Sequence, residues 1–298
     1  MKCFHHNDLD GRCAGAVVNL FREAKAIEEC QFIEMEYSKD FPLDLVKSNE
    51  RVYIVDFHVQ DDDDFRKLQE ITKNITLIDH HKSTVEHRDK HPELYSDIES
   101  IIDSSRSGCW LTWEYFIFSY GNRTVPRALL LIDDMDRWIW KYGDKTANFC
   151  EGMKLYPHQP TDTIWQDLLM SEYTSLETKP EKSDDKRLDI IADGKICVQY
   201  ANMICEDYVS SYGFETEFEG HKAFAQGLYA YGSKAFGERI KQYPLLISFE
   251  FTGDKYIIGL YSETIDVSEI AVKHGGGGHK GASGFIANEL PFRSIKNE

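Results

Sequence analysis

The sequence predicts an α/β protein with an N-terminal domain built on a parallel sheet, a connecting helix and a smaller C-terminal α/β domain. Apolar, often β-branched segments alternate with helical patterns through the first hundred residues, a polar stretch spans 175–187, and the alternation resumes at His221. Strands that alternate with helices favour a parallel sheet with helices on both faces. We therefore expect a first domain at 1–180, a linker with a connecting helix at 181–215 and a second domain at 216–298.

The first half of the chain supplies the elements of the predicted parallel sheet. Strands are expected at Lys2–His6, Gln31–Glu36, Val52–Val55 and Ile75–Ile78, and helices at Gly11–Ala24, Pro42–Lys47 and Asp61–Ile71. The helix at 61–71 opens with four aspartates, which suit the positive end of a helix. The segment 105–120 is apolar nearly all round, so we expect a buried helix whose aromatic residues belong to the core.

The second half begins with a helical stripe and continues as a smaller α/β pattern. The stripe that predicts the connecting helix consists of Leu188, Ile191, Val198, Ala201, Cys205 and Tyr208. Strands are then expected at Ala223–Tyr231, Leu245–Phe251 and Tyr256–Tyr261, and helices at Lys234–Lys241 and Val267–Lys273. Gly253 and Asp254 predict a hairpin turn between the last two strands.

Composition limits the classes of protein that the chain can represent. With 298 residues, 42% of them hydrophobic, it is long enough to bury proper cores. Its 34 basic and 51 acidic residues give a net charge of −17, which opposes binding of long duplex nucleic acid but allows a small anionic substrate held by metal ions.

The cysteines and the N-terminus point to a reducing, aqueous location. Seven cysteines show no Cys-x-x-Cys pairing and no zinc-like spacing, so we expect reduced, mostly buried thiols. No stretch approaches the roughly 18 apolar residues of a membrane span, and polar residues interrupt the N-terminus. A soluble, cytoplasmic protein without a membrane partner is the expectation, and a homodimer is left open.

Carboxylates and imidazoles stand at the ends of several apolar segments. Asp8 and Asp10 follow the first strand, Asp56 the third and the triplet Asp79-His80-His81 the fourth, and Leu129–Ile132 runs into a further acidic cluster that contains Asp134. In a parallel sheet, ligands collect at the carboxyl ends of the strands. Oxygen-rich sites with one or two histidines suit manganese or magnesium. A centre of two divalent ions is therefore expected at this edge.

Each of these signals also has an ordinary structural explanation. Asp8, Asp10 and Gly11 are typical turn residues, although Asp8, Asp10 and His6 would project to one side of an extended segment. Asp56 could simply cap the following turn. Trp138 and Trp140, which follow the acidic cluster, are expected to pack rather than to take part in chemistry. It is the convergence of the segments on one edge that favours the metal centre.

A glycine-rich segment near the C-terminus predicts an anion-binding loop. Gly275, Gly276, Gly277 and Gly278 are followed directly by His279 and Lys280. Consecutive glycines let backbone amides approach an anion closely, and the two cationic side chains can complete the cradle. The alternative is a flexible hinge, and the spacing matches neither the Walker nor the Rossmann pattern.

With these motifs in their order, the chain resembles the DHH phosphoesterase superfamily, in the subset with a DHH-associated C-terminal domain, over nearly its whole length. The matching motifs are His6 to Gly11, Asp56, Asp79-His80-His81, Asp134 with Asp136 and Trp138, and Gly275 to His279. Within the superfamily the likeness is strongest to oligoribonucleases that degrade very short RNAs.

The resemblance implies a role for each motif residue. One metal would be held by His6, Asp8 and Asp56, and the other by Asp10, Asp56, His80 and Asp134, so that Asp56 bridges them. His81 would face the substrate phosphate as a donor or general acid, and Asp79 would orient an imidazole. The C-terminal domain would bind the far phosphate or base of the substrate across an interdomain cleft.

We therefore expect a hydrolase that cleaves short oligoribonucleotides or linear dinucleotides with two divalent ions, manganese first, with magnesium and cobalt as alternatives. Rival substrates are 3′-phosphoadenosine 5′-phosphate, cyclic dinucleotides, pyrophosphate or polyphosphate, and single-stranded DNA. A nucleotide-binding regulator without catalysis is the rival outside the enzyme class, and the site rather than the fold must decide.

Overall fold

The computed structural model describes residues 1–24, 29–37, 39–117, 124–170 and 185–295, and the side chains of Ile117 and His279 lie outside this description. The chain divides into two compact units, Met1–Cys197 and Val198–Glu298. The division falls inside helix α8 (Lys186–Tyr212), which confirms the predicted connecting helix. Most of the polar stretch at 175–187, including the predicted domain boundary at 180, lies outside the described residues.

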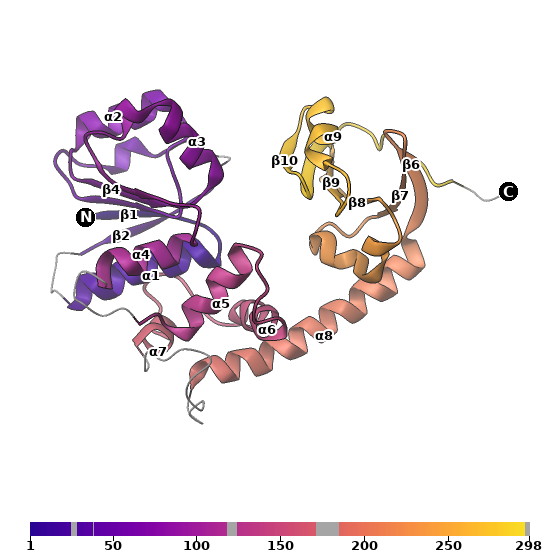
Figure 1. The fold of residues 1–298 in the computed structure, drawn as a ribbon, viewed down its shortest axis with the longest axis horizontal. Helices are drawn as coiled ribbons and strands as arrows, with labels where there is room; N and C mark the ends of the chain where they lie inside the picture. The colour runs from indigo at the N-terminus through magenta and orange to yellow at the C-terminus, as the bar shows by residue number, and fades with distance from the viewer. Residues whose placement is uncertain (25–28, 38, 118–123, 171–184, 296–298) are drawn as a thin grey trace. The chain divides into compact units, whose positions relative to one another are not determined.

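The first unit is built on a five-stranded sheet with the order β2-β1-β3-β4-β5 (Figure 1). Its strands are β1 (Lys2–His6), β2 (Gln31–Met35), β3 (Val52–Val55), β4 (Ile75–Asp79) and β5 (Glu99–Ile102). Every neighbouring pair is parallel, which confirms the predicted sheet type. The register pairs His5 with Val55 and Val55 with Ile78, so the residues that follow these strands emerge at one edge.

Helices cover both faces of this sheet because successive strand residues point to opposite sides. Cys3 and Val55 belong to the core beneath α1 and α4, whereas Phe4 and Ile54 belong to the core beneath α2 and α3 (Figure 1). The helical elements are α1 (Leu9–Ala24), the 3₁₀ turn η1 (Leu43–Leu45), α2 (Asp62–Ile71), α3 (Lys82–Lys90), the 3₁₀ turn η2 (Pro92–Leu94), α4 (Gly108–Ile117), α5 (Arg127–Asp136), α6 (Asp144–Met153) and α7 (Ile164–Met170).

The predicted buried aromatic helix is confirmed by α4. Trp113 and Phe116 are buried in the core that α4 shares with α1, and Leu111 lies there with them. The last residues of the predicted range, 118–120, lie outside the described part of the chain.

Three predicted elements differ from the structure in ways that affect the site. Helix α1 begins at Leu9, so Asp10 is helical and does not stand in an extended loop. Leu129–Ile132 forms part of helix α5 rather than an apolar segment that ends at the sheet edge. Leucine and alanine are strong helix formers, and tertiary contact buries this run without strand pairing. The helix expected at Pro42–Lys47 is reduced to η1.

The second unit contains a six-stranded sheet with the order β10-β11-β9-β8-β7-β6. Its elements are β6 (Phe214–Phe218), β7 (His221–Gln226), the 3₁₀ segment η4 (Gly232–Lys241), β8 (Leu245–Phe251), β9 (Tyr256–Tyr261), α9 (Val267–Lys273), β10 (Gly277–His279) and β11 (Ala282–Ala287). β8, β9 and α9 have the predicted bounds, and the predicted hairpin joins β8 to β9 through a turn in which Gly253 has a φ of 108°.

Two predictions drawn from composition can be compared with this fold. All seven cysteines carry free thiols, and five of them are buried. In the parts of the chain that the structure describes, no helix is long and apolar enough to cross a membrane.

Candidate metal centre

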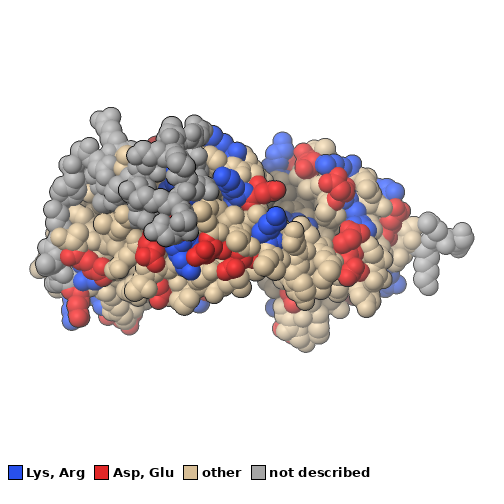
Figure 2. All heavy atoms as spheres, turned by 90° about the horizontal axis from the view of Figure 1, so that it is seen from below, with Lys and Arg blue, Asp and Glu red and all other residues tan. Residues whose placement is uncertain are grey.

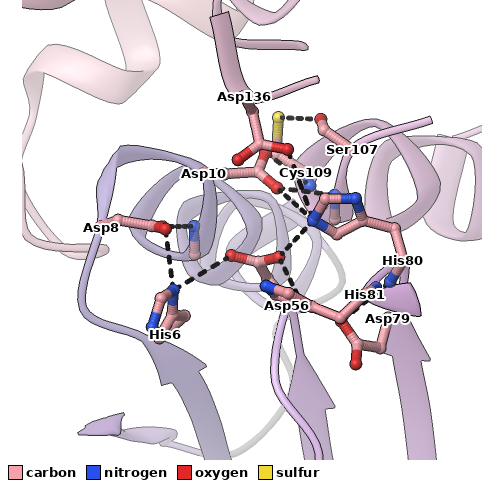
Figure 3. A network of polar contacts seen from close by, with 12 residues as sticks. His6, Asp8, Asp10, Asp56, Asp79, His80, His81, Ser107, Cys109 and Asp136 are labelled. Atoms are coloured by element: carbon pink, nitrogen blue, oxygen red, sulfur yellow. Dashed lines mark hydrogen bonds and ion pairs between the residues drawn. The ribbon is translucent and has the colours of Figure 1, made fainter. Parts of the chain in front are cut away.

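The first group of donors gathers at the carboxyl ends of β1 and β3 (Figure 3). His6 is the last residue of β1, Asp8 lies in the turn before α1, and Asp56 follows β3. His6 Nδ1 lies 2.8 Å from Asp8 Oδ2 and 3.9 Å from Asp56 Oδ2. One donor atom from each of the three residues lies within 4.8 Å of the other two, so a single cation can reach all three.

The second group consists of Asp10, His80 and Asp136, again with donor atoms within 4.8 Å of one another. His80 Nε2 lies 3.4 Å from Asp136 Oδ2 and 3.7 Å from Asp10 Oδ2. Asp10 also accepts hydrogen bonds from the amides of Gly108 (2.6 Å) and Cys109 (3.0 Å) at the start of α4. The positive end of α4 therefore fixes this carboxylate in place.

Asp56 belongs to the first group and also lies beside His80 of the second group, as Figure 3 shows. Its Oδ1 is 3.1 Å from His80 Nε2, while its Oδ2 faces His6. The side chain is 1% exposed and the backbone has a φ of 54°, an uncommon conformation for a residue other than glycine. Burial and the charges of Asp10 and Asp8 raise the pKa of Asp56 well above its ordinary value. Cations held by the two groups would both lie within reach of this carboxylate.

The donor set fits divalent cations. Among the described residues, both carboxylate oxygens of Asp56, Nε2 of His80 and Oδ2 of Asp136 are buried without a hydrogen-bond partner. Unpartnered buried polar atoms of this kind are costly, and native proteins satisfy nearly all of them. Burial and the charge of Asp10 also raise the pKa of Asp136 to about 9. Cations between these atoms would pair them and offset the repulsion among the carboxylates.

The structure places Asp136, and not the predicted ligand Asp134, beside His80. The Asp134 carboxylate accepts hydrogen bonds from the amides of Lys141 (2.7 Å) and Tyr142 (3.1 Å) and from the Thr146 hydroxyl. A helix turns by about 100° per residue, so side chains two residues apart point to nearly opposite sides of its axis. The helical form of α5 therefore directs Asp136 to His80 and Asp134 to the turn that follows.

Trp138 and Trp140 were expected to pack; their rings contact each other, 5.0 Å apart between centroids, but Trp138 lies at the surface. Its side chain is 62% exposed, whereas Trp113 and Trp165 are each 1% exposed. The sequence contained one signal for this difference, the position of Trp138 two residues after Asp136, the last residue of α5.

Asp79 holds His81 rather than facing the cation groups. Its Oδ1 accepts from the amide of His80 (2.8 Å) and lies 2.7 Å from His81 Nδ1, and its Oδ2 accepts from the Thr84 hydroxyl. Burial alone would raise the pKa of Asp79, but hydrogen bonds from His58 and His81 lower it below its ordinary value. Burial likewise opposes the charge on His81, yet Asp79 raises the pKa of that imidazole. This geometry agrees with the orienting role predicted for Asp79.

Several residues around His81 were missed by the sequence analysis. His58 and Tyr37 both lie near it: the Tyr37 hydroxyl is 3.4 Å from His81 Nδ1, and His58 Nδ1 lies 2.7 Å from the Thr84 hydroxyl that supports Asp79. His58 comes two residues after Asp56, and this position at a strand end is the one signal that could have indicated it.

Gly108 was also missed, although the close approach of α4 to the site depends on it. A Cβ at this position would lie 2.5 Å from Asp56 Cβ and 2.6 Å from Asp56 Oδ1. Gly108→Ala must therefore displace the bridging carboxylate or the amides that hold Asp10. We expect metal affinity to fall roughly 10- to 100-fold, as when residues that support metal ligands are changed. Calorimetric titration of the variant with Mn²⁺ measures this, and unchanged affinity would contradict the placement of α4.

The glycine motif of the second unit begins by closing helix α9. The amides of Gly275 and Gly276 donate to the carbonyls of Val272 (3.0 Å) and Ala271 (2.9 Å). These two amides are satisfied within the unit and therefore do not point into the predicted four-amide anion cradle. Gly276 instead permits a close backbone approach, because a Cβ there would lie 2.1 Å from the carbonyl oxygen of Gly284.

The second half of the glycine motif forms β10, the strand at one end of the six-stranded sheet. Gly277 and Gly278 lie in β10, which pairs on one side with β11, and Lys280 is exposed in the turn that follows. The side chain of His279 lies outside the described part of the structure. Substrate binding by these four residues stays a prediction.

Two curated proteins and several solved structures are similar to this chain. No protein-family model matches the chain. The chain is 28% identical over 280 residues to the uncharacterized protein R106 of Acanthamoeba polyphaga mimivirus, an alignment that covers 87% of this chain but only 59% of that protein. It is 26% identical over 294 residues to oligoribonuclease NrnB of Bacillus subtilis, covering 94% of this chain and 71% of the relative.

Among solved structures, exonuclease RecJ bound to manganese is similar, with a TM-score of 0.50 and 12% identity over 97% of this chain and 85% of that one. The likeness confirms the class of fold, an α/β protein with a parallel-sheet unit followed by a second, mixed-sheet unit. The similarity to NrnB agrees with the resemblance of the motif residues, in their order, to the DHH phosphoesterase superfamily.

Proposed function

We propose that the protein is a metal-dependent phosphodiesterase that hydrolyses short oligoribonucleotides or linear dinucleotides to mononucleotides. The observation that carries the proposal is the pair of donor groups that meet at Asp56, with buried donor atoms that have no hydrogen-bond partner among the described residues. The relative named oligoribonuclease supports the choice of substrate.

In this proposal, His6, Asp8 and Asp56 hold one cation, and Asp10, Asp56, His80 and Asp136 hold the other. Manganese is the proposed ion, with magnesium and cobalt as alternatives, because the set is rich in oxygen and contains few imidazoles. Two divalent cations, when bound, activate water and neutralise charge that develops on the phosphoryl group.

The remaining residues position the reaction. Asp79 engages Nδ1 of His81, so Nε2 is the nitrogen left to donate to a phosphate oxygen or to the leaving group. The hydrogen bond to Asp79 also favours the charged imidazolium, which is the better donor. Asp10 is held by the α4 amides, so that the site is ordered before substrate arrives.

Surface charge favours a short substrate. On the face shown in Figure 2, the described lysines and arginines lie interspersed with aspartates and glutamates. With a net charge of −17, long nucleic acid would meet overall repulsion, whereas a substrate of a few nucleotides depends mainly on the metal centre.

The test is a Mn²⁺-supplemented assay on RNAs of graded length, run beside single-stranded DNA, cyclic dinucleotides, pyrophosphate, polyphosphate and 3′-phosphoadenosine 5′-phosphate. We expect mononucleotide release that is fastest for the shortest RNAs. His80→Ala should abolish release while the folded circular dichroism spectrum persists. Preferred turnover of pyrophosphate or of the phosphoadenosine substrate would overturn the proposed substrate, and full activity of His80→Ala would overturn the site.

A further inference from the structure

Two tryptophans lie shortly after Asp136, a residue of the proposed metal centre, in the sequence. Trp138 and Trp140 lie in the turn between α5 and α6, two and four residues after Asp136. Their rings are 5.0 Å apart between centroids and meet edge to face. The Trp138 side chain is 62% exposed, although an indole is among the largest apolar groups that folding can bury. Most of the Trp138 indole can therefore contact a partner outside the fold.

The backbone of this turn is held in an uncommon conformation. Trp138 and Trp140 both have a φ of +58°, a region that bulky side chains rarely adopt. Asp134 maintains this conformation. Its carbonyl accepts hydrogen bonds from the amides of Ile139 and Trp140, and its buried carboxylate accepts from the amides of Lys141 and Tyr142. Strained backbone that the surrounding structure enforces is typical of functional sites.

The turn lies beside the reacting centre. Consecutive Cα atoms are about 3.8 Å apart, so the Cα of Trp138 is at most about 7.6 Å from that of Asp136. Asp136 in turn reaches to 3.4 Å from His80. A side chain as long as tryptophan at this position can therefore contact a group attached to a phosphate bound at the centre.

We propose that Trp138 is a stacking platform for a nucleobase next to the scissile phosphodiester. The proposal rests on the proposed function and narrows its substrate class. An exposed aromatic ring stacks on any base, since every base has a π face, so base-carrying phosphodiesters are favoured without preference for one base. Pyrophosphate and polyphosphate carry no ring, and they gain nothing from Trp138.

The kinetic test compares a dinucleotide with the same dinucleotide made abasic at one or both positions. Trp138→Ala should lower kcat/KM for the intact dinucleotide roughly 5- to 150-fold, the usual range for the loss of one base–aromatic stack. Turnover of the fully abasic diester should be unchanged. Trp138→Phe should restore most of the loss, and Leu155→Ala, which removes another exposed apolar side chain of the same unit, should match the wild type. Equal losses on both substrates would overturn the proposal.

A second variant separates stacking from a structural role. Trp138→Gly removes the indole and also suits the positive φ, so the thermal midpoint should be kept or raised while kcat/KM for the dinucleotide falls. A lowered midpoint with equal losses on intact and abasic substrates would show that Trp138 serves the fold and would overturn the proposal.

A binding measurement distinguishes failure of this inference from failure of the proposed function. With Mn²⁺ present, 5′-AMP, a product of the proposed reaction, should quench tryptophan fluorescence of the wild type more than that of Trp138→Phe, and ribose 5-phosphate should quench both proteins equally. Quenching by 5′-AMP that is equal in wild type and variant overturns the role of Trp138 while dinucleotide hydrolysis stands. Absence of dinucleotide turnover in the wild type overturns the proposed function itself.

Discussion

Replacing Asp56 by asparagine should abolish hydrolysis and, in the absence of metal, stabilise the protein. In the proposed centre this carboxylate would serve both cations, and loss of several kcal/mol of charge stabilisation corresponds to a fall in kcat of at least about 10³-fold. Without cations the same carboxylate is a buried charge among other carboxylates, and its pKa is raised by burial and by Asp10. An amide should therefore raise the thermal midpoint in EDTA, by about 2–4 °C for each ~1 kcal/mol gained.

The pH dependence of stability gives this prediction a control. Because the pKa values of Asp56 and Asp136 are raised, the metal-free native state binds more protons than the unfolded chain above the ordinary aspartate pKa of about 3.9. The free energy of unfolding should then fall as pH rises toward the pKa of about 9 of Asp136. The fall should be shallower in Asp56→Asn. A destabilised Asp56→Asn protein in EDTA would contradict a site that requires cations.

Asp136→Asn should lower activity without lowering stability, whereas Asp134→Asn should lower stability. Asp136 is a proposed ligand, so its amide variant should lose at least about 10²-fold in kcat. Because the pKa of Asp136 is raised like that of Asp56, its thermal midpoint in EDTA should be kept or raised. Asp134 accepts hydrogen bonds from two amides and a hydroxyl, and an asparagine would turn an NH₂ donor toward some of these donors. Leaving such buried groups unpaired costs about 1–3 kcal/mol, so Asp134→Asn should lower the midpoint.

The metal affinities of the two variants can be compared under conditions in which both proteins are folded. Mn²⁺ affinity, measured at a temperature where both are fully folded, should fall much further for Asp136→Asn than for Asp134→Asn. Thermal melts in EDTA should show the reverse order. If Asp134→Asn loses metal while Asp136→Asn retains it, the assignment made from the sequence was right and the structural correction is wrong.

The sheet edge could be predicted from sequence because strand periodicity and strand ends are local signals. Val52–Val55 and Ile75–Ile78 are short, β-branched runs, and in a parallel sheet the residues that follow them must share an edge. Asp56 and His80 were placed correctly by this reasoning alone. The same locality explains why β8, β9 and α9 were predicted with their bounds.

The remaining parts of the site depend on contacts between distant segments. Whether Asp134 or Asp136 reaches His80 is decided by the helical phase of α5, and an apolar run of four residues does not distinguish a strand from a buried helix. Gly108 acts through its approach to Asp56, fifty-two positions earlier in the sequence, which no local pattern reveals. The exposure of Trp138 follows from hydrogen bonds that Asp134 makes in the finished fold.

Equilibrium dialysis against Mn²⁺ tests the central claim most directly, because the claim is that one protein chain holds two cations on either side of Asp56. We predict two ions per chain for the wild type, and for Asp56→Ala a loss of both or retention of at most one, weakly bound. Binding of two ions by Asp56→Ala with wild-type affinity, or hydrolysis of short RNA by wild-type protein that holds no divalent ion, would contradict the account.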